Sequence, residues 1–281
     1  MRMEGENRTI VQCGLEGIDR SDFTGLHALL REAGLTGRPV SSVQIGFVLA
    51  PRINAAGRMG RAELAAELLL TQDPAKAERL ARELCDLNRE RQSVEQDIFR
   101  CAIEQMDTLA PTERNALVLS SEEWHQGVVG IVASRLSEKF SCPSFMIHLA
   151  GGMGKGSCRS YGGFNLFEAL SACSENLTGF GGHALAAGLN IRRDRLDRFR
   201  EALAAYYRRH RPAPLPEVCC DLLITDPSLL SVENVRSLDM LEPYGNANPK
   251  PIMCICGATL ESASEVGGGK HLRMRVRLGA S

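Results

Sequence analysis

The sequence predicts an α/β protein in which a long helix precedes the α/β part and a β-rich segment follows it. Between residues 115 and 191, short apolar runs alternate with helical patterns, which is typical of a layered α/β domain. Residues 73–106 keep an apolar spacing of three and four over their whole length, which predicts one continuous helix. Residues 272–278 alternate between apolar and arginine side chains, as a strand does.

Composition sets the limits of this interpretation. A length of 281 residues predicts about two domains. The net charge of −1 excludes a global basic field, so a nucleic-acid footprint must be local. No apolar run approaches the ~18 residues of a transmembrane helix, and the first residues lack a signal-peptide core, so we expect a cytoplasmic protein with no membrane partner. The ten cysteines form no C-x-x-C pair, and we expect reduced, mostly buried thiols without a zinc site or disulfide framework.

The first part of the chain predicts short helices and one polar loop. Helices are expected at residues 6–11 and 25–33, and Gly34 ends the second. In residues 43–60 an apolar segment runs into a proline, and a polar loop with Arg52, Asn54 and Arg58 follows. Guanidinium groups donate in a planar fork, so this loop suits phosphate or carboxylate recognition. Alternatively, the arginines cap helices or pair with nearby glutamates.

The long helix begins at Asp73-Pro74, where an N-cap residue is followed by proline in the first turn. Its apolar spacing is interrupted by Arg91. Such a helix would span about 50 Å, and we interpret it as a strut between two domains. A coiled-coil dimer seam is the alternative, which the charge at Arg91 weakens.

The α/β part carries three polar motifs between its expected elements. The strands are expected at 116–119, 145–147, 156–160 and 189–191, and the helices at 127–140 and 165–172. Trp124-His125 stands where a strand becomes a helix, so His125 could face an anion or cap the helix. The glycine run 151–157 does not fit the phosphate loop of nucleotide-binding proteins, because Leu149 stands where its leading glycine should be.

The stretch 181–188 is rich in glycine and contains His183. Backbone N–H groups in such a turn can form an anion-binding concavity, to which His183 could donate. The alternative is a tight turn into a buried strand, with His183 in the core.

The last part of the chain is basic and β-rich. Residues 192–211 predict a basic amphipathic helix, which is either a solvated face or a surface that faces nucleic acid. The proline-rich stretch 211–216 predicts a stiff linker and the main domain boundary. After a helix at 228–240 and a strand at 252–255, the glycines 267–269 predict a hairpin turn. Arg273, Arg275 and Arg277 would form the basic face of a small barrel that binds single strands, but too few strands remain to close it.

Taken together, six motifs in collinear order resemble the RecJ family of single-stranded-DNA-specific exonucleases, which belongs to the DHH phosphoesterase superfamily. The motifs cover nearly the whole chain and lie at residues 5–8, 51–58, 124–133, 156–160, 181–188 and 241–249. A glycine–histidine motif alone occurs throughout the superfamily, whereas six in order are specific.

The resemblance implies a domain order. Residues 1–60 would be the C-terminal remnant of the DHH domain with a phosphate-contacting loop, and 61–110 the connecting helix. Residues 111–211 would be the DHH-associated α/β domain that grips the nucleotide, and 217–281 a partial OB-like barrel that binds nucleic acid.

The resemblance also implies function and site residues. The family hydrolyses single-stranded DNA from 5′ to 3′ in repair and recombination and uses Mn²⁺ or Mg²⁺. We expect a monomer, with single-strand-binding protein and a helicase as partners. His183 would line the reaction site, and Ser157 and Arg159 would contact phosphate with Arg58 or Arg52. The remaining binding positions would be Asn54, Trp124, His125, Ser160, Gly181, Gly182 and the three arginines of the last strand.

One departure from the family pattern bears on activity. The sequence contains no Asp-His-His and no Asp-x-Asp, and its six histidines are far apart. Two-metal hydrolysis needs clustered carboxylate and imidazole ligands. We therefore expect an incomplete RecJ-like chain without metal ligands, inactive by itself. The alternatives are a stand-alone single-strand clamp and another phosphodiesterase of the superfamily, such as a small-nucleotide enzyme or an alanyl-tRNA editing module.

Overall fold

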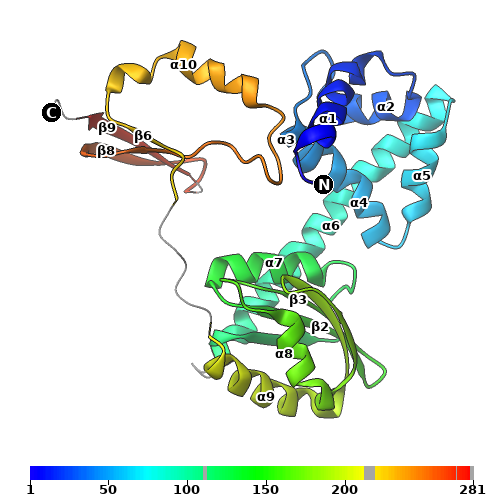
Figure 1. Cartoon of the computed structure of the whole chain (residues 1–281). Coiled ribbons are helices and arrows are strands. Elements are labelled where there is room, and N and C mark those ends of the chain that lie inside the picture. Colours follow the sequence, from blue (N-terminus) through cyan, green and yellow to red (C-terminus); the bar gives the residue numbers. More distant parts are fainter. Residues whose placement is uncertain (110–112, 212–218, 270, 279–281) are drawn as a thin grey trace. The chain divides into compact units, whose positions relative to one another are not determined.

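The computed structural model describes residues 1–109, 113–211, 219–269 and 271–278 (Figure 1). The chain forms two compact units. The larger comprises Asp22–Arg38 and Gly46–Leu215, and the smaller comprises Met1–Ser21, Pro39–Ile45 and Pro216–Ser281. The expected linker at 211–216 lies almost wholly outside the described residues.

The larger unit begins with a helical layer. The helices are α2 (Thr24–Glu32), α4 (Ala50–Arg58), α5 (Ala62–Leu70) and α6 (Pro74–Thr108). The helix expected at 25–33 is confirmed, and Gly34 follows it with a φ of +70°, which glycine adopts without strain. Gly25 is required for packing, because a Cβ there would lie 1.7 Å from the carbonyl oxygen of Leu68.

The polar loop expected after Pro51 is wrong. Residues 45–49 form a π-helical segment that continues directly into α4, so Arg52, Asn54 and Arg58 all lie on a helix. Proline is tolerated at this place because the first-turn N–H groups of a helix have no intrahelical acceptor. The apolar run therefore belongs to a helix and not to a strand.

The long helix α6 is confirmed. The Asp73 carboxylate accepts from the backbone N–H groups of Ala75 and Lys76, at 2.9 and 3.3 Å, and so caps its first turn. The helix spans about 50 Å at 1.5 Å per residue. Its N-terminal half packs on α2, α4 and α5, and its C-terminal half enters the α/β core through Ile98 and other side chains. Because this apolar face is covered within the chain, no coiled-coil partner is needed to bury it.

The α/β part is built on one five-stranded sheet. The strands are β1 (Leu117–Ser121), β2 (Ser144–Ala150), β3 (Met153–Arg159), β4 (Leu177–Gly182) and β5 (Ala186–Arg192). Their order in the sheet is β1-β2-β3-β5-β4. The β1–β2 pair is parallel and the other pairs are antiparallel.

Helices cover the two faces of this sheet unequally (Figure 1). On one face α7 (Val129–Phe140) packs with α6 against β1 and β2, around Leu117, Met146 and Val132. On the other face α8 (Leu166–Ala172) and α9 (Leu196–Arg209) cover the sheet out to β5, around Phe145, Leu189 and Phe199. The α7-side positions of β5, such as Asn190, are exposed, so that face is open beyond β3.

The smaller unit joins both ends of the chain. It contains α1 (Gly5–Gly17), α3 (Ser42–Gln44), α10 (Val232–Ser237), the pair β6 (Leu222–Ile224) and β7 (Met253–Ile255), and the hairpin β8 (Ala258–Val266) and β9 (His271–Leu278). Arg8, in the motif 5–8, donates to the carbonyl oxygens of Met240 and Glu242 at 3.1 and 3.0 Å. These bonds link that motif to the start of the motif 241–249.

The described part of the smaller unit holds two two-stranded sheets and no closed barrel. The hairpin expected around 267–269 is confirmed, with Leu260 opposite Val276 and Ser264 opposite Arg273. Both faces of the hairpin are exposed, since Met274 is exposed like its arginine neighbours. The helix expected at 228–240 forms in part as the α-helix α10, and 3-10 turns at Pro227–Leu229 and Leu238–Leu241 flank it.

Two general expectations can be compared with the structure. The expectation of mostly buried cysteines is wrong, because only Cys85, Cys142, Cys158 and Cys173 are buried. In the described ranges, no helix combines the length and the apolarity that crossing a membrane requires.

Candidate functional site

The site is built around the first turn of α7 and the short loop before it. The carbonyl oxygen of His125 accepts from the N–H groups of Val128 and Val129, at 3.0 and 3.2 Å. The His125 ring accepts from the N–H of Gly127 at 3.2 Å through Nδ1. His125 therefore stabilises the turn that starts the helix. The Nδ1 atom of His125 therefore bonds within this turn, which agrees with the alternative that His125 has a local structural role at the helix start.

Gly127 brings α4 against this loop. A Cβ at Gly127 would lie 2.1 Å from the carbonyl oxygen of Arg58, so only glycine fits there. The Arg58 guanidinium donates back to the carbonyl oxygen of Gly127 at 3.1 Å through Nη1. This reciprocal contact fixes the C-terminal end of α4, and with it Arg58, beside the start of α7.

Arg159 approaches the same turn from β3. Its Nε donates to Ser134 Oγ at 3.1 Å, and its Nη1 donates to the carbonyl oxygen of Cys158 at 2.8 Å. A Cβ on Gly130 would lie 3.4 Å from Arg159 Nη2 and 3.3 Å from Ser157 Oγ. Gly130 thus keeps α7 close to a hydroxyl and a guanidinium. This cluster of Arg58, Ser157, Arg159 and the first turn of α7 is called the α7 site below.

The α7 site has an excess of positive charge. Burial lowers the pKa of Arg58, and the nearby Arg91 and Arg159 lower it further, whereas Glu95 raises it. A guanidinium remains charged in any case, so the two neighbouring arginines add positive charge around Arg58. An anion bound there would relieve the repulsion and would also meet the positive end of the α7 dipole.

Arg91 is the component that sequence reasoning missed. Arg91 lies on the otherwise apolar face of α6 and is buried there. Its Nη1 donates to Glu95 Oε2 at 2.6 Å, and its Nη2 donates to Asn88 Oδ1 at 2.7 Å. Glu95 also pairs with Arg135 at 3.4 Å. The only signal in the sequence is Glu95 four residues after an arginine in an apolar stripe.

The sheet register brings the glycine–histidine stretch beside β3. Ser157 pairs with Gly188, and Gly188 pairs with Gly181 on the next strand. The turn between β4 and β5 is closed by the N–H of His183, which donates to the carbonyl oxygen of Ala186 at 2.9 Å. The N–H of Ser160 donates to the carbonyl oxygen of Leu185 at 3.1 Å, so the turn lies next to the end of β3.

His183 itself is exposed, so the alternative of a core histidine is wrong. Gly182 has a φ of +134°, and a Cβ there would lie 2.5 Å from the carbonyl oxygen of Ala186. The stretch is therefore a tight turn that presents the His183 ring to solvent. The structure brings the motifs 156–160 and 181–188 together at the end of β3 and the β4–β5 turn.

The other predicted binding residues of the larger unit differ in burial and in their contacts within the protein. Trp124 is 2% exposed and packs in the core between α6, α7 and the sheet, so its ring is not available for base stacking. Arg52 donates to the carbonyl oxygen of Val48 at 2.6 Å and contacts Cys85 Sγ at 3.2 Å. The Ser160 hydroxyl donates to the carbonyl oxygen of Phe164 at 2.5 Å. Asn54 is exposed on α4.

The three arginines of β9 belong to the smaller unit. Arg273, Arg275 and Arg277 are exposed, and Arg277 pairs with Glu261 at 2.7 Å. Ser264 and Ser262 face Arg273 and Arg275 across the hairpin. This surface is basic and open.

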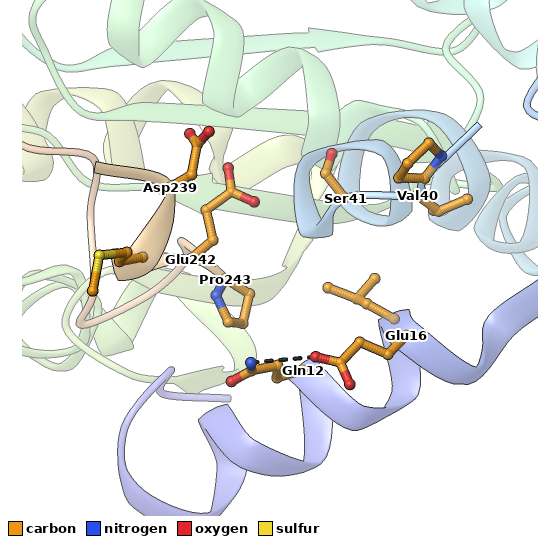
Figure 2. Close-up of a pocket in the computed structure, with 10 residues that line it drawn as sticks. Gln12, Glu16, Val40, Ser41, Asp239, Glu242 and Pro243 are labelled. Carbon is orange, nitrogen blue, oxygen red and sulfur yellow. Dashed lines mark hydrogen bonds between the residues drawn. The ribbon is translucent and has the colours of Figure 1, made fainter. Parts of the chain in front are cut away.

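Two cavities differ in charge. One, of about 630 Å³, lies beside the α7 site and is lined by Arg58, the loop 122–127 and His148. The other, of about 360 Å³, lies in the smaller unit and includes Glu16, Asp239 and Glu242 in its lining (Figure 2). The first cavity has Arg58 in its lining together with Glu122 and Glu123, whereas the second has no basic side chain in its lining.

The described residues offer no cluster of metal ligands. Within the described ranges, no group of three or more histidine, cysteine, aspartate or glutamate side chains could hold a metal ion. The α7 site offers guanidinium, hydroxyl and backbone N–H donors, which suit an anion, and it has no carboxylate or imidazole ligand of its own.

Comparison with known proteins finds relatives that match nearly the whole chain. The DHHA1 domain family matches residues 113–209, and the RecJ OB domain family matches residues 222–280. The single-stranded-DNA-specific exonuclease RecJ of Thermus thermophilus is 40% identical over 97% of this chain and 39% of its own length.

Solved structures agree with this relationship. The crystal structure of RecJ in complex with Mg²⁺ from Thermus thermophilus has a TM-score of 0.85 at 38% identity, and covers 98% of this chain and 42% of that one. The corresponding structure with Mn²⁺ has the same score and identity, with 98% and 40% covered. The chain spans less than half of the length of the curated relatives it matches.

Proposed function

We propose that this chain, which belongs to the RecJ family, binds the 5′-phosphorylated end of single-stranded DNA as part of a 5′-to-3′ exonuclease. The observation that carries the proposal is the α7 site. There burial lowers the pKa of Arg58, and Arg91 and Arg159 lie close enough to lower it further, next to the first turn of α7. A terminal phosphate carries more charge than an internal phosphodiester, so it gains more from such a site.

Each residue of the α7 site has a distinct proposed role. Arg159 is held by Ser134 and Cys158, so its remaining N–H groups can donate to phosphate oxygens without a loss of side-chain entropy on binding. Ser157 would donate its hydroxyl to the same phosphate, and Arg58 would donate from α4. Arg91 is a positioning residue, because it is buried and acts through charge.

The glycine–histidine turn has a proposed role in the reaction. Gly181 and Gly182 would let the strand approach the backbone of β4, and the exposed His183 would lie near the scissile phosphate. Mn²⁺ or Mg²⁺ would supply the activated water in the complete enzyme. The described residues do not fit such an ion, so we propose that its ligands lie elsewhere and that this chain alone does not hydrolyse DNA.

The arginine face of β9 would bind the following part of the strand without sequence preference, as OB-like domains do. Single-strand-binding protein and a helicase as partners, a monomeric state and a cytoplasmic location complete the proposal. DNA repair and recombination are the processes in which such an activity would act.

The test is binding of this 281-residue chain to a single-stranded oligonucleotide with a 5′-phosphate and to the same oligonucleotide with a 5′-hydroxyl. We expect tighter binding of the phosphorylated strand and weaker binding of a blunt duplex. Equal affinity for both 5′ ends would contradict the assignment of the α7 site. Release of nucleotides by the chain with Mn²⁺ would contradict the proposal that the metal ligands lie elsewhere.

A second candidate is a single-strand clamp without chemistry of its own. The absence of a metal-binding group among the described residues favours it. It predicts binding that depends on strand length and salt but not on the 5′-phosphate, so the same titrations separate the two functions.

A further inference from the structure

A third cavity, of about 520 Å³, lies in the larger unit between the turn that precedes β4 and the start of α9. The lining residues are Glu175, Asn176, Arg195, Arg198, Glu201 and Ala202. Asn176 comes directly before β4, and the glycine–histidine turn follows the other end of that strand, about 20 Å away. No lining residue belongs to the α7 site, so this cavity is a separate feature of the molecule.

Asn176 is a buried polar residue whose side chain is open to this cavity. It is 6% exposed, and its backbone N–H donates to the carbonyl oxygen of Cys173 at 3.1 Å. Across the described ranges, the side-chain amide of Asn176 has no hydrogen-bond partner, yet it is not sealed off from the cavity that it lines. Because buried polar groups in proteins are nearly always hydrogen-bonded, an amide left in this state indicates a place for a polar ligand.

Four charged side chains surround this amide. They are Arg195, Arg198, Glu175 and Glu201. In the part of the chain that the structure describes, none of the four takes part in an ion pair. The acidic neighbours on α9 and before it are already paired, Asp194 with Arg192 at 2.7 Å and Asp197 with Arg200 at 2.8 Å. The cavity therefore offers two guanidinium groups and two carboxylates to a ligand.

This lining favours one class of ligand over others. A nucleotide base gains affinity by stacking on aromatic side chains, whereas Ala202 is the one apolar residue of this lining. The two carboxylates would repel a phosphate dianion. A zwitterion meets both signs of charge, because a guanidinium donates to a carboxylate in a planar fork and a glutamate pairs with an ammonium group.

We propose that this cavity binds a small zwitterion of the α-amino-acid class. The carboxylate of the ligand would accept from the Arg195 guanidinium and from the Asn176 amide. Its ammonium group would pair with Glu175 or Glu201. The cavity is within the range of volumes found for small-molecule sites, so it also has room for the side chain of the ligand. The inference does not rest on the proposed function, because the two sites share no residue.

The experiment is an NMR titration of the isotopically labelled 281-residue chain, followed through the backbone signals of residues 174–177 and the side-chain amide of Asn176. Three probes separate the two charges of the ligand. L-Alanine carries both, propionate lacks the ammonium group, and L-alaninamide lacks the carboxylate. The titrations are repeated with Asn176→Asp and Arg195→Gln. Arg209→Ala is the matched control, because Arg209 lies in the last turn of α9, at the opposite end from the cavity.

We expect L-alanine to bind about tenfold more tightly than propionate or L-alaninamide, because each of these lacks one charge-assisted contact. Arg195→Gln should weaken the binding of L-alanine about tenfold, since it removes the charge that faces the carboxylate. Asn176→Asp should weaken it as strongly, because a second carboxylate replaces the donor. Arg209→Ala should leave it unchanged.

Three outcomes would overturn the inference. These are no shift with L-alanine, equal affinity for L-alanine and propionate, and tighter binding of thymidine 5′-monophosphate at the same residues, which would assign the cavity to a nucleotide. Should Asn176→Asp fail to fold, Arg195→Gln and the comparison of the three probes on the unchanged chain still decide. None of these results alters the binding of a 5′-phosphorylated strand, so this inference and the proposed function fail separately.

Discussion

Arginine occurs in two contrasting settings in this chain. In the larger unit, Arg159 is half-buried, and two of its nitrogens are held by Ser134 and Cys158. In the smaller unit, the arginines of β9 are exposed on a hairpin. A held guanidinium donates in a fixed direction, whereas an exposed one is screened by salt and loses side-chain entropy on binding. The same residue type should therefore recognise a particular group in one setting and a general charge in the other.

The largest expected effect concerns the buried charges of α6 near Arg58. We expect Glu95→Ala to lower the free energy of unfolding by about 3 kcal/mol, because Arg91 then keeps a buried charge without its carboxylate. Unfolding in urea is followed by the fluorescence of Trp124, the one tryptophan of the chain, which reports on the same core. Asp97→Ala removes an exposed pair with Arg100 and should cost less than about 0.5 kcal/mol. Equal losses in the two variants would show that burial does not distinguish these pairs.

Arg159→Ala should give the next largest effect. Loss of a charge-assisted contact of about 1.5–3 kcal/mol corresponds to a roughly 10- to 150-fold weaker binding of a 5′-phosphorylated strand. The 5′-hydroxyl strand should be affected much less, so the preference for phosphate falls. Arg159→Lys should not restore it, since an ammonium cannot reproduce the fork geometry. Arg198→Ala on the exposed side of α9 is the control. If Arg159→Ala keeps the preference for a 5′-phosphate, the held arginine does not recognise a particular group any more than the exposed ones do.

Gly130→Ala tests the α7 site by adding a methyl group without changing any charge. The added methyl group would lie 3.3 Å from Ser157 Oγ and 3.4 Å from Arg159 Nη2, close to the place proposed for the phosphate. We expect about tenfold weaker binding of the phosphorylated strand with a change in unfolding free energy below about 1 kcal/mol, since alanine favours a helix. Titration and thermal unfolding of the same sample check both parts. A variant that loses stability but binds normally would show that Gly130 serves packing alone.

The smallest expected effect is in the exposed arginines. Arg275→Ala should weaken binding of a long single strand two- to threefold, and should reduce the slope of log affinity against log salt by about 0.7. The preference for a 5′-phosphate should not change. Titrations at several salt concentrations measure both quantities. An unchanged salt slope would mean that the β9 surface does not contact the strand.

Much of the fold can be predicted from residues that are close together in the sequence. Asp73-Pro74 starts α6, because an N-cap carboxylate and a proline fit only the first turn of a helix. The glycines 267–269 turn the β8–β9 hairpin, and period-two alternation predicts its second strand. Each of these signals acts between residues close together in the chain, so the sequence alone suffices.

What the tertiary structure decided depends on contacts between distant residues. The sequence by itself determined the family motifs and most of the helices and strands between residues 73 and 191. It did not determine that residues 50–58 are helical, that Trp124 is buried, or that the charge of Arg91 lies near Arg58. Burial and the sum of nearby charges are set by packing across the chain, and no local pattern encodes them.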